Sequence, residues 1–193
     1  YARQLDNWGD HSVSLSILKQ IKGEDLLRAS QSVNYEYSSV LGVIALNSQN
    51  PQLALKHYKS ALEYAKKSDQ AEIIQAGYSN VGNCLNALER SEEALIYFQK
   101  ALRFELEGVN RNSLYIRLNI ALTQSKLERY EDAKRAFLKT LDLLSVSKDA
   151  YAESRTLMNL GDIYLQQDSL QIAQSYFSRA KEVASKNGLS LVM

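Results

Sequence analysis

The chain of 193 residues carries 23 basic and 22 acidic side chains, which gives a formal net charge of +1. This balance supplies no broad field to attract nucleic acid or an anionic membrane, so we expect neither as a partner. One proline and eight glycines offer little turn chemistry for a β protein, while 45% apolar residues suffice for a buried core. These numbers predict an all-α fold.

Cysteine content and hydropathy limit the remaining classes. Cys84 is the single cysteine, which excludes an intramolecular disulfide and a metal site built from several cysteines. No apolar run approaches the roughly 18 residues that a membrane span needs, so we expect no direct membrane insertion. The chain begins with Tyr1 rather than Met, and we therefore expect it to be a piece of a longer protein.

Four segments share one spacing: a small residue, an aromatic or similar ring four positions later, and a small residue three beyond that. They are Ala54, Tyr58 and Ala61; Ala94, Phe98 and Ala101; Ala133, Phe137 and Thr140; and Ala173, Phe177 and Ala180. The leading alanines are 40, 39 and 40 residues apart, a fixed period that is typical of a repeat array. We predict that the rings form the core between paired helices.

A second small residue precedes each leading alanine by 12 positions: Gly42, Gly82, Ala121 or Gly161. Glycine in the middle of a helix costs about 0.5–1 kcal/mol relative to alanine, so its recurrence indicates close helix packing. Each repeat is therefore predicted to be two antiparallel helices, A and B, with this small residue of A against the leading alanine of B.

The predicted helices follow one another with short joints. We expect helices A at residues 25–47, 70–88, 111–127 and 149–166, and helices B at residues 51–67, 91–107, 130–145 and 169–186. Asn50, which precedes a proline, and Ser91 are typical of N-caps, and Asp69 with Glu72 resembles a capping box. Gly188 is expected to end the last helix.

Together these positions resemble the tetratricopeptide repeat over roughly residues 35–187. The small residue of helix A, the leading alanine, the ring and the last small residue match its eighth, twentieth, twenty-fourth and twenty-seventh positions. The third copy departs from the pattern at Ala121, Gln124 and Thr140, and the period exceeds the usual one. Such long repeats are similar to those of motor light chains, cell-polarity adaptors and sensor halves of bacterial signalling proteins.

The resemblance implies a right-handed α-solenoid of stacked helix pairs. Ser14, Leu18 and Ile21 lie one period before the first clear helix B, which predicts a degenerate half-repeat at the start. The expected divisions are a half-repeat with the start of the first helix A at 1–34, repeats at 35–74, 75–113, 114–153 and 154–187, and the start of a further, truncated helix at 188–193.

Residues for catalysis are sparse. His11 and His57 are isolated, and no G-x-S-x-G motif, phosphate-binding glycine loop or Cys–His combination is present. Acidic residues in predicted first turns fit a favourable interaction with the helix dipole; they are Glu92, Glu93, Glu131 and Asp132. We predict no enzyme activity, no metal and no cofactor.

An open stack leaves a concave face lined by A helices, where binding is expected. Its sixth motif position is Asn80, Asn119 and Asn159 in successive repeats. The resemblance implies that such asparagines hold the main chain of an extended peptide; alternatively, each bonds the adjacent helix and orders the stack. The other expected groove residues are Ser79, Asn83, Tyr115, Leu118, Arg155, Asp162 and Gln166.

A chaperone-type clamp for a terminal carboxylate is a more specific alternative. It requires three cations, and only Arg155 is present, because Ser79 and Asn159 occupy the other basic positions. The loss of charge-assisted hydrogen bonds argues against this clamp.

Two functions remain open at this point. The first is a non-catalytic protein- or peptide-binding module, the sensor or scaffold part of a larger, bacterial signalling protein. The second is a structural module that self-assembles through its convex face or terminal repeats, which would make a homo-oligomer. Localisation also stays open: periplasmic for the sensor half of a membrane protein, and cytoplasmic otherwise.

Overall fold

The computed structural model describes residue 26 and residues 29–105 and 110–189, and the regular structure in them is entirely α-helical. This confirms the predicted all-α class. The chain divides into two compact units, Tyr1–Leu106 and Glu107–Met193. No helix among the described residues is long and apolar enough to cross a membrane. The predicted half-repeat and residues 190–193 of the expected further helix lie outside the described residues.

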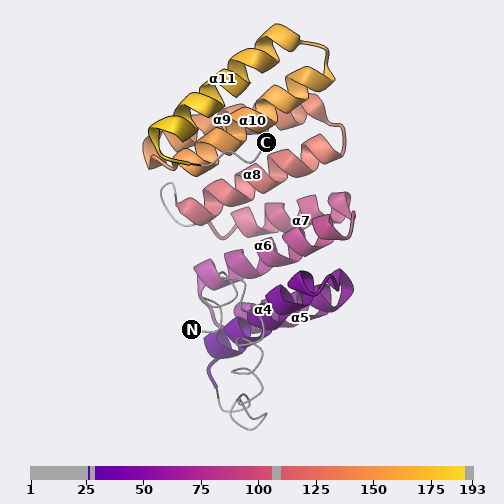
Figure 1. The fold of residues 1–193 in the computed structure, drawn as a ribbon. Helices are drawn as coiled ribbons and strands as arrows, with labels where there is room; N and C mark the ends of the chain where they lie inside the picture. The colour runs from indigo at the N-terminus through magenta and orange to yellow at the C-terminus, as the bar shows by residue number, and fades with distance from the viewer. Residues whose placement is uncertain (1–25, 27–28, 106–109, 190–193) are drawn as a thin grey trace. The chain divides into compact units, whose positions relative to one another are not determined.

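The described residues of each unit form two helical hairpins (Figure 1). The N-terminal unit has α4 (Gln31–Asn47), α5 (Pro51–Lys67), α6 (Ala71–Ala87) and α7 (Ser91–Leu102). The C-terminal unit has α8 (Arg111–Lys126), α9 (Tyr130–Ser147), α10 (Ala150–Gln166) and α11 (Leu170–Lys186). Within each unit the second helix also packs on the third, and the first on the third. Even-numbered helices are the predicted A helices, and odd-numbered ones the B helices.

One helix begins, and another ends, several residues away from the predicted bound. Helix α4 begins at Gln31 instead of residue 25, because the Ser30 side chain caps it by accepting from the Val33 amide at 3.3 Å. Helix α7 ends at Leu102 instead of residue 107. There the amide of Phe104 bonds three residues back to Ala101, and the Phe104 ring stacks on Tyr78 of α6 with centroids 5.8 Å apart.

Of the predicted caps, Asn50 is confirmed: its side chain accepts from the Leu53 amide at 3.1 Å. The cap at Ser91 and the capping box at Asp69 are wrong. Helix α7 already includes Ser91, and the N-cap positions of α6 and α7 are Gln70 and Arg90, neither of which caps through its side chain. Asp69 instead has left-handed backbone, with φ of 52°.

The joint from helix A to helix B has one geometry in all four hairpins. A non-glycine residue takes left-handed backbone, and the amide that follows it donates to a carbonyl five residues back at 2.9 Å. This is the Schellman motif. The left-handed residues are Gln49, Glu89, Glu128 and Asp168, with φ of 56°, 61°, 58° and 55°. An identical joint explains why the 12-residue spacing never changes.

Gly188 ends α11 in the same way, as predicted. Its φ is 64°, and the Leu189 amide donates to the Ala184 carbonyl at 2.9 Å.

Three A-helix glycines lie closest to the rings of the B helices, and their predicted contact with the leading alanines stays a prediction. A Cβ built on Gly42 would lie 2.6 Å from Tyr58 Cε1, and Gly161 faces Phe177 in the same way. The glycine is therefore needed because the ring of helix B lies across its backbone. The predicted core position of the rings is confirmed for Tyr58, Phe98 and Phe137, which are buried, whereas Phe177 is half-buried.

The last small position of the third repeat shows how a polar residue is accommodated. Thr140 is 1% exposed, and its hydroxyl donates to the Ala136 carbonyl at 2.8 Å. The hydroxyl is thus satisfied inside its own helix, and Thr140 replaces alanine without a buried unpaired donor.

Candidate functional site

The C-terminal unit places two of the predicted asparagines on neighbouring A helices. Asn119 lies on α8 and Asn159 on α10, which pack together, and both residues are half-buried. The Asn159 side-chain nitrogen donates to the Arg155 carbonyl at 2.7 Å, one turn back in its own helix. The stack-ordering alternative requires a bond to another helix, whereas this bond stays within α10.

Tyr115 on α8 is held against the start of α10. Its hydroxyl donates to Asp149 Oδ2 at 3.3 Å, and the Arg111 guanidinium pairs with the same oxygen at 3.3 Å. The other Asp149 oxygen accepts from the Ala152 amide at 3.1 Å and so caps α10. This network fixes the ends of two A helices, so Tyr115 has a structural role at the edge of the face.

The remaining predicted residues of this unit divide by exposure. Arg155, Asp162 and Gln166 are exposed on α10. Partial desolvation raises the pKa of the Asp162 carboxyl even though the residue is exposed. Leu118 was expected in the groove but is buried at 4% exposure, in a core cluster with Phe137. Leu118 therefore belongs to the hydrophobic core and not to the candidate site.

The N-terminal unit carries Ser79, Asn80 and Asn83 on α6. Ser79 and Asn80 are half-buried, and Asn83 is exposed. Asn119 and Asn159 lie on neighbouring helices of one unit, and the ladder that would add Asn80 stays a prediction.

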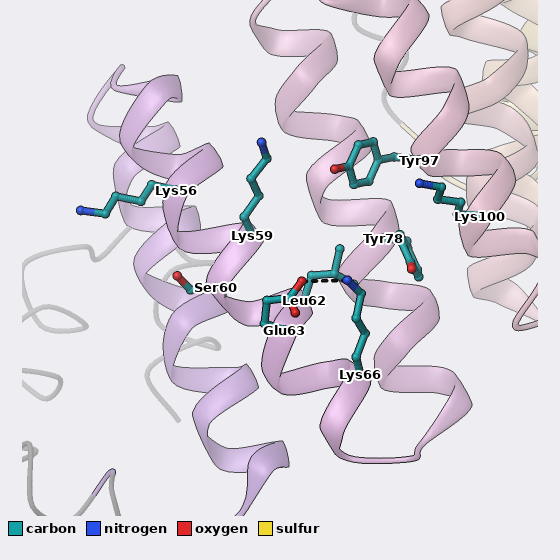
Figure 2. A pocket seen from close by; sticks show the side chains of 9 residues that line it. All are labelled: Lys56, Lys59, Ser60, Leu62, Glu63, Lys66, Tyr78, Tyr97 and Lys100. Carbon is teal, nitrogen blue, oxygen red and sulfur yellow. Dashed lines mark hydrogen bonds and ion pairs between the residues drawn. The ribbon is translucent and has the colours of Figure 1, made fainter.

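A second site, missed from the sequence, is a pocket of about 470 Å³ in the N-terminal unit, formed by α5, α6 and α7 (Figure 2). We call it the lysine pocket. It is lined by Lys56, Lys59, Ser60, Leu62, Glu63, Lys66, Tyr78, Tyr97 and Lys100. A signal was present on α5, where Lys56, Lys59, Glu63 and Lys66 follow helical spacing. Such a stripe normally indicates only a solvated face.

Among the described residues, no group of three His, Cys, Asp or Glu side chains is arranged to hold a metal ion. Cys84 is fully buried on α6, and its thiol donates to the Pro51 carbonyl at 3.2 Å. Burial raises the pKa of this thiol, which keeps it protonated and unreactive.

Two family models match the chain, and both are described as tetratricopeptide repeat. One covers residues 110–186 and the other residues 76–106, which together make up more than half of the chain. The chain belongs to the tetratricopeptide repeat family. The predicted resemblance is thereby confirmed.

Known proteins similar to this tetratricopeptide repeat chain include response regulator aspartate phosphatase I of Bacillus subtilis (strain 168). That relative is 27% identical over 135 residues, which are 69% of this chain and 33% of the relative. Superkiller protein 3 of Schizosaccharomyces pombe is 24% identical over 165 residues, 85% of this chain and 10% of the relative. The chain thus spans about a third of the first relative and less of the second.

Solved structures show the same fold. The crystal structure of BtubC from P. vanneervenii has a TM-score of 0.81 and 20% identity, covering 100% of this chain and 80% of that one. The apo form of RapI has a TM-score of 0.74 and 18% identity, covering 93% of this chain and 64% of that one. The predicted α-solenoid of antiparallel helix pairs is confirmed.

Proposed function

We propose that this chain is a non-catalytic module that binds an extended peptide segment along its A helices. In this proposal it is the sensor or scaffold part of a larger bacterial signalling protein. The observation that carries the proposal is the pair Asn119 and Asn159, half-buried side chains at one repeat position on neighbouring A helices.

A side-chain amide can donate and accept hydrogen bonds at once, so it pairs with the main chain of a peptide of any sequence. Asn159 donates to the Arg155 carbonyl of its own helix. A peptide carbonyl could take the place of this acceptor at little cost. Arg155 and Gln166, exposed on the same helix, would then contact the peptide's side chains.

Relatives support the signalling context. Both response regulator aspartate phosphatases I and J of Bacillus subtilis match part of this chain. A structure similar to it is that of a Rap protein complexed with Competence and Sporulation Factor, with a TM-score of 0.74 and 18% identity.

Peptide selection followed by a double substitution tests this proposal. A displayed library of random peptides is selected on the chain, and the best peptide is then titrated by fluorescence anisotropy. We expect Asn119→Ala with Asn159→Ala to weaken its binding about tenfold or more, because hydrogen bonds to main-chain groups are lost.

The matched control is Gln99→Ala with Gln174→Ala, which removes two exposed amides from B helices. This variant should bind the peptide as the unaltered chain does. Unchanged affinity in the asparagine variant, with its helical circular dichroism intact, overturns the proposal.

Self-assembly is a second candidate, favoured by apolar exposure on α11. Leu170 is 64% and Ile172 47% exposed near the start of this helix. Association that buried these two side chains would remove their apolar surface from water. Sedimentation equilibrium tests this candidate: a dimer that Leu170→Ser with Ile172→Ser converts to monomer supports it, and a monomeric unaltered chain rejects it.

A further inference from the structure

The lysine pocket has an excess of unneutralised positive charge. Its one acidic residue, Glu63, accepts from Lys66 Nζ at 2.7 Å. Within the described part of the chain, Lys56, Lys59 and Lys100 make no ion pair with a carboxylate. Glu93 is close enough for Lys59 to affect its pKa, but it is bonded by Arg90 at 2.6 Å.

Aromatic rings hold the far wall of the pocket in place. Tyr78 of α6 lies between Tyr97 and Phe104, with ring centroids 6.2 Å and 5.8 Å away. Lys66 Nζ lies 5.9 Å from the Tyr78 centroid, and Lys100 Nζ 5.4 Å from that of Tyr97. Cation–π attraction keeps these two ammonium groups over the rings and therefore at the pocket.

The side chains of Lys56 and Lys59, both on α5, point in different directions. In Figure 2 the Tyr97 hydroxyl points toward the side on which Lys59 lies, whereas Lys56 extends away from the other side chains. Lys59, Lys66 and Lys100 thus line the hollow, and Lys56 extends the positive charge along α5 at its rim.

The lysines of α5 lie along one face of the helix, in a line parallel to its axis. From Lys56 to Lys66 the stripe on α5 extends for about 15 Å at 1.5 Å per residue. An extended peptide of four or five residues has about this length at roughly 3.3 Å per residue. A single phosphate would require cations that converge on one point, so the spacing favours several carboxylates in succession.

The internal copy of this region shows that the fold does not require Lys59 or Lys66. Two repeats further on, at the corresponding helices α9 to α11, Tyr176 and Arg179 keep the ring and the cation of Tyr97 and Lys100. Elsewhere in the copy, Leu138, Ser145 and Leu157 replace Lys59, Lys66 and Tyr78, whereas Arg135 and Asp142 keep the charges of Lys56 and Glu63, and Lys139 replaces Ser60. The same hairpin thus forms without cations at the positions of Lys59 and Lys66, so packing alone does not account for those two lysines.

We propose that the lysine pocket binds an acidic segment of a partner protein, in extended conformation along α5. Carboxylates of the segment pair with Lys59 and Lys100, and Lys56 contacts an acidic residue that continues past the rim. The lysines of this site lie on the B helices α5 and α7, whereas Asn119 and Asn159 lie on A helices of the other unit.

Hexaglutamate with a fluorescent label is the probe, and it is titrated by anisotropy at low salt. We expect binding that Lys59→Gln with Lys100→Gln weakens about tenfold or more, since two charge-assisted contacts are lost. The matched control, Lys139→Gln with Lys181→Gln, removes the same charge from exposed positions of the C-terminal unit. It should lower affinity less than about twofold, through screened long-range interactions alone.

Comparison probes decide between ligand classes. Hexaglutamine should not bind, and inorganic phosphate and an oligo-dT strand should compete poorly with hexaglutamate. Equal losses in the pocket and control variants, or stronger binding of phosphate or oligo-dT, overturn the proposal. The Asn119→Ala, Asn159→Ala variant should bind hexaglutamate normally; if it alone loses that binding, the acidic segment lies on the A helices and the pocket assignment is wrong.

Discussion

Gly82 of α6 lies against the ring of Phe98 in α7 so closely that a Cβ on Gly82 would be 2.6 Å from Phe98 Cε1. Gly42 has the same relationship with Tyr58 one repeat earlier. Real Cβ atoms do not approach a ring atom to this distance, so the backbone of helix A itself forms the ring's contact surface. The recurring glycine and the recurring ring are therefore one packing unit.

The first prediction follows for Gly82→Ala. The methyl group must displace Phe98, which is fully buried, so the free energy of unfolding should fall by about 1–3 kcal/mol. Urea denaturation measures the loss. In a double-mutant cycle with Phe98→Leu the two losses should be less than additive, because the smaller side chain admits the methyl. Strictly additive losses would contradict the packing unit.

The second prediction concerns the left-handed joints. Glu128 has φ of 58° and is exposed, and an L residue in this conformation costs about 1 kcal/mol or more, whereas glycine does not. We expect Glu128→Gly to raise the free energy of unfolding by about 0.5–1 kcal/mol, after the extra entropy of glycine in the unfolded chain. Glu128→Ala removes the same carboxylate but keeps the strain. Thermal unfolding that finds both variants equally stable would speak against this account.

Repeats and hairpins could be predicted because their signals are local and recur. Small residues at Gly82 and Ala94 keep a fixed distance only if the joint between their helices is fixed, and the structure shows that joint. The cap at Ser91 was predicted wrongly because its signal is absent from the sequence. Glu89 occupies a left-handed position usually held by glycine, so the sequence carried no mark of it and Ser91 resembled a cap.

Sites were harder to predict than the fold. Leu118 was assigned to the groove from a motif position, but burial depends on packing around α8 that motif numbering does not contain. The lysine pocket combines side chains from three helices, and only the stripe on α5 is visible in sequence. That Lys100 and Tyr78 lie beside it follows from the packing of α5 and α7 on α6.

The third prediction uses Cys84 as a reporter of the N-terminal unit. Its thiol is fully buried and bonded to Pro51, and burial raises its pKa, so the reactive thiolate is scarce in the folded chain. Ellman's reagent should react with it only through opening of the unit, and the rate should rise with added urea. Because the chain has one cysteine, the signal needs no correction. Rapid reaction without urea, at the rate of the denatured chain, would show that α6 does not cover the thiol.

The fourth prediction concerns His57 on α5, whose pKa is lowered below 6.5 by desolvation and, to a smaller extent, by the neighbouring Lys56. Between that lowered pKa and about 6.5 the unfolded chain takes up a proton that the folded chain refuses, so stability falls as the pH drops through this window. Urea denaturation at about pH 7.5 and about pH 5.5 should show this loss, and His57→Gln should reduce it, since all other groups are shared. The carboxylates whose pKa values are lowered, Glu93, Glu131 and Glu182, start from 4.5 and titrate below this window. An equal loss in both proteins would mean that His57 is as well hydrated in the folded chain as in the unfolded one.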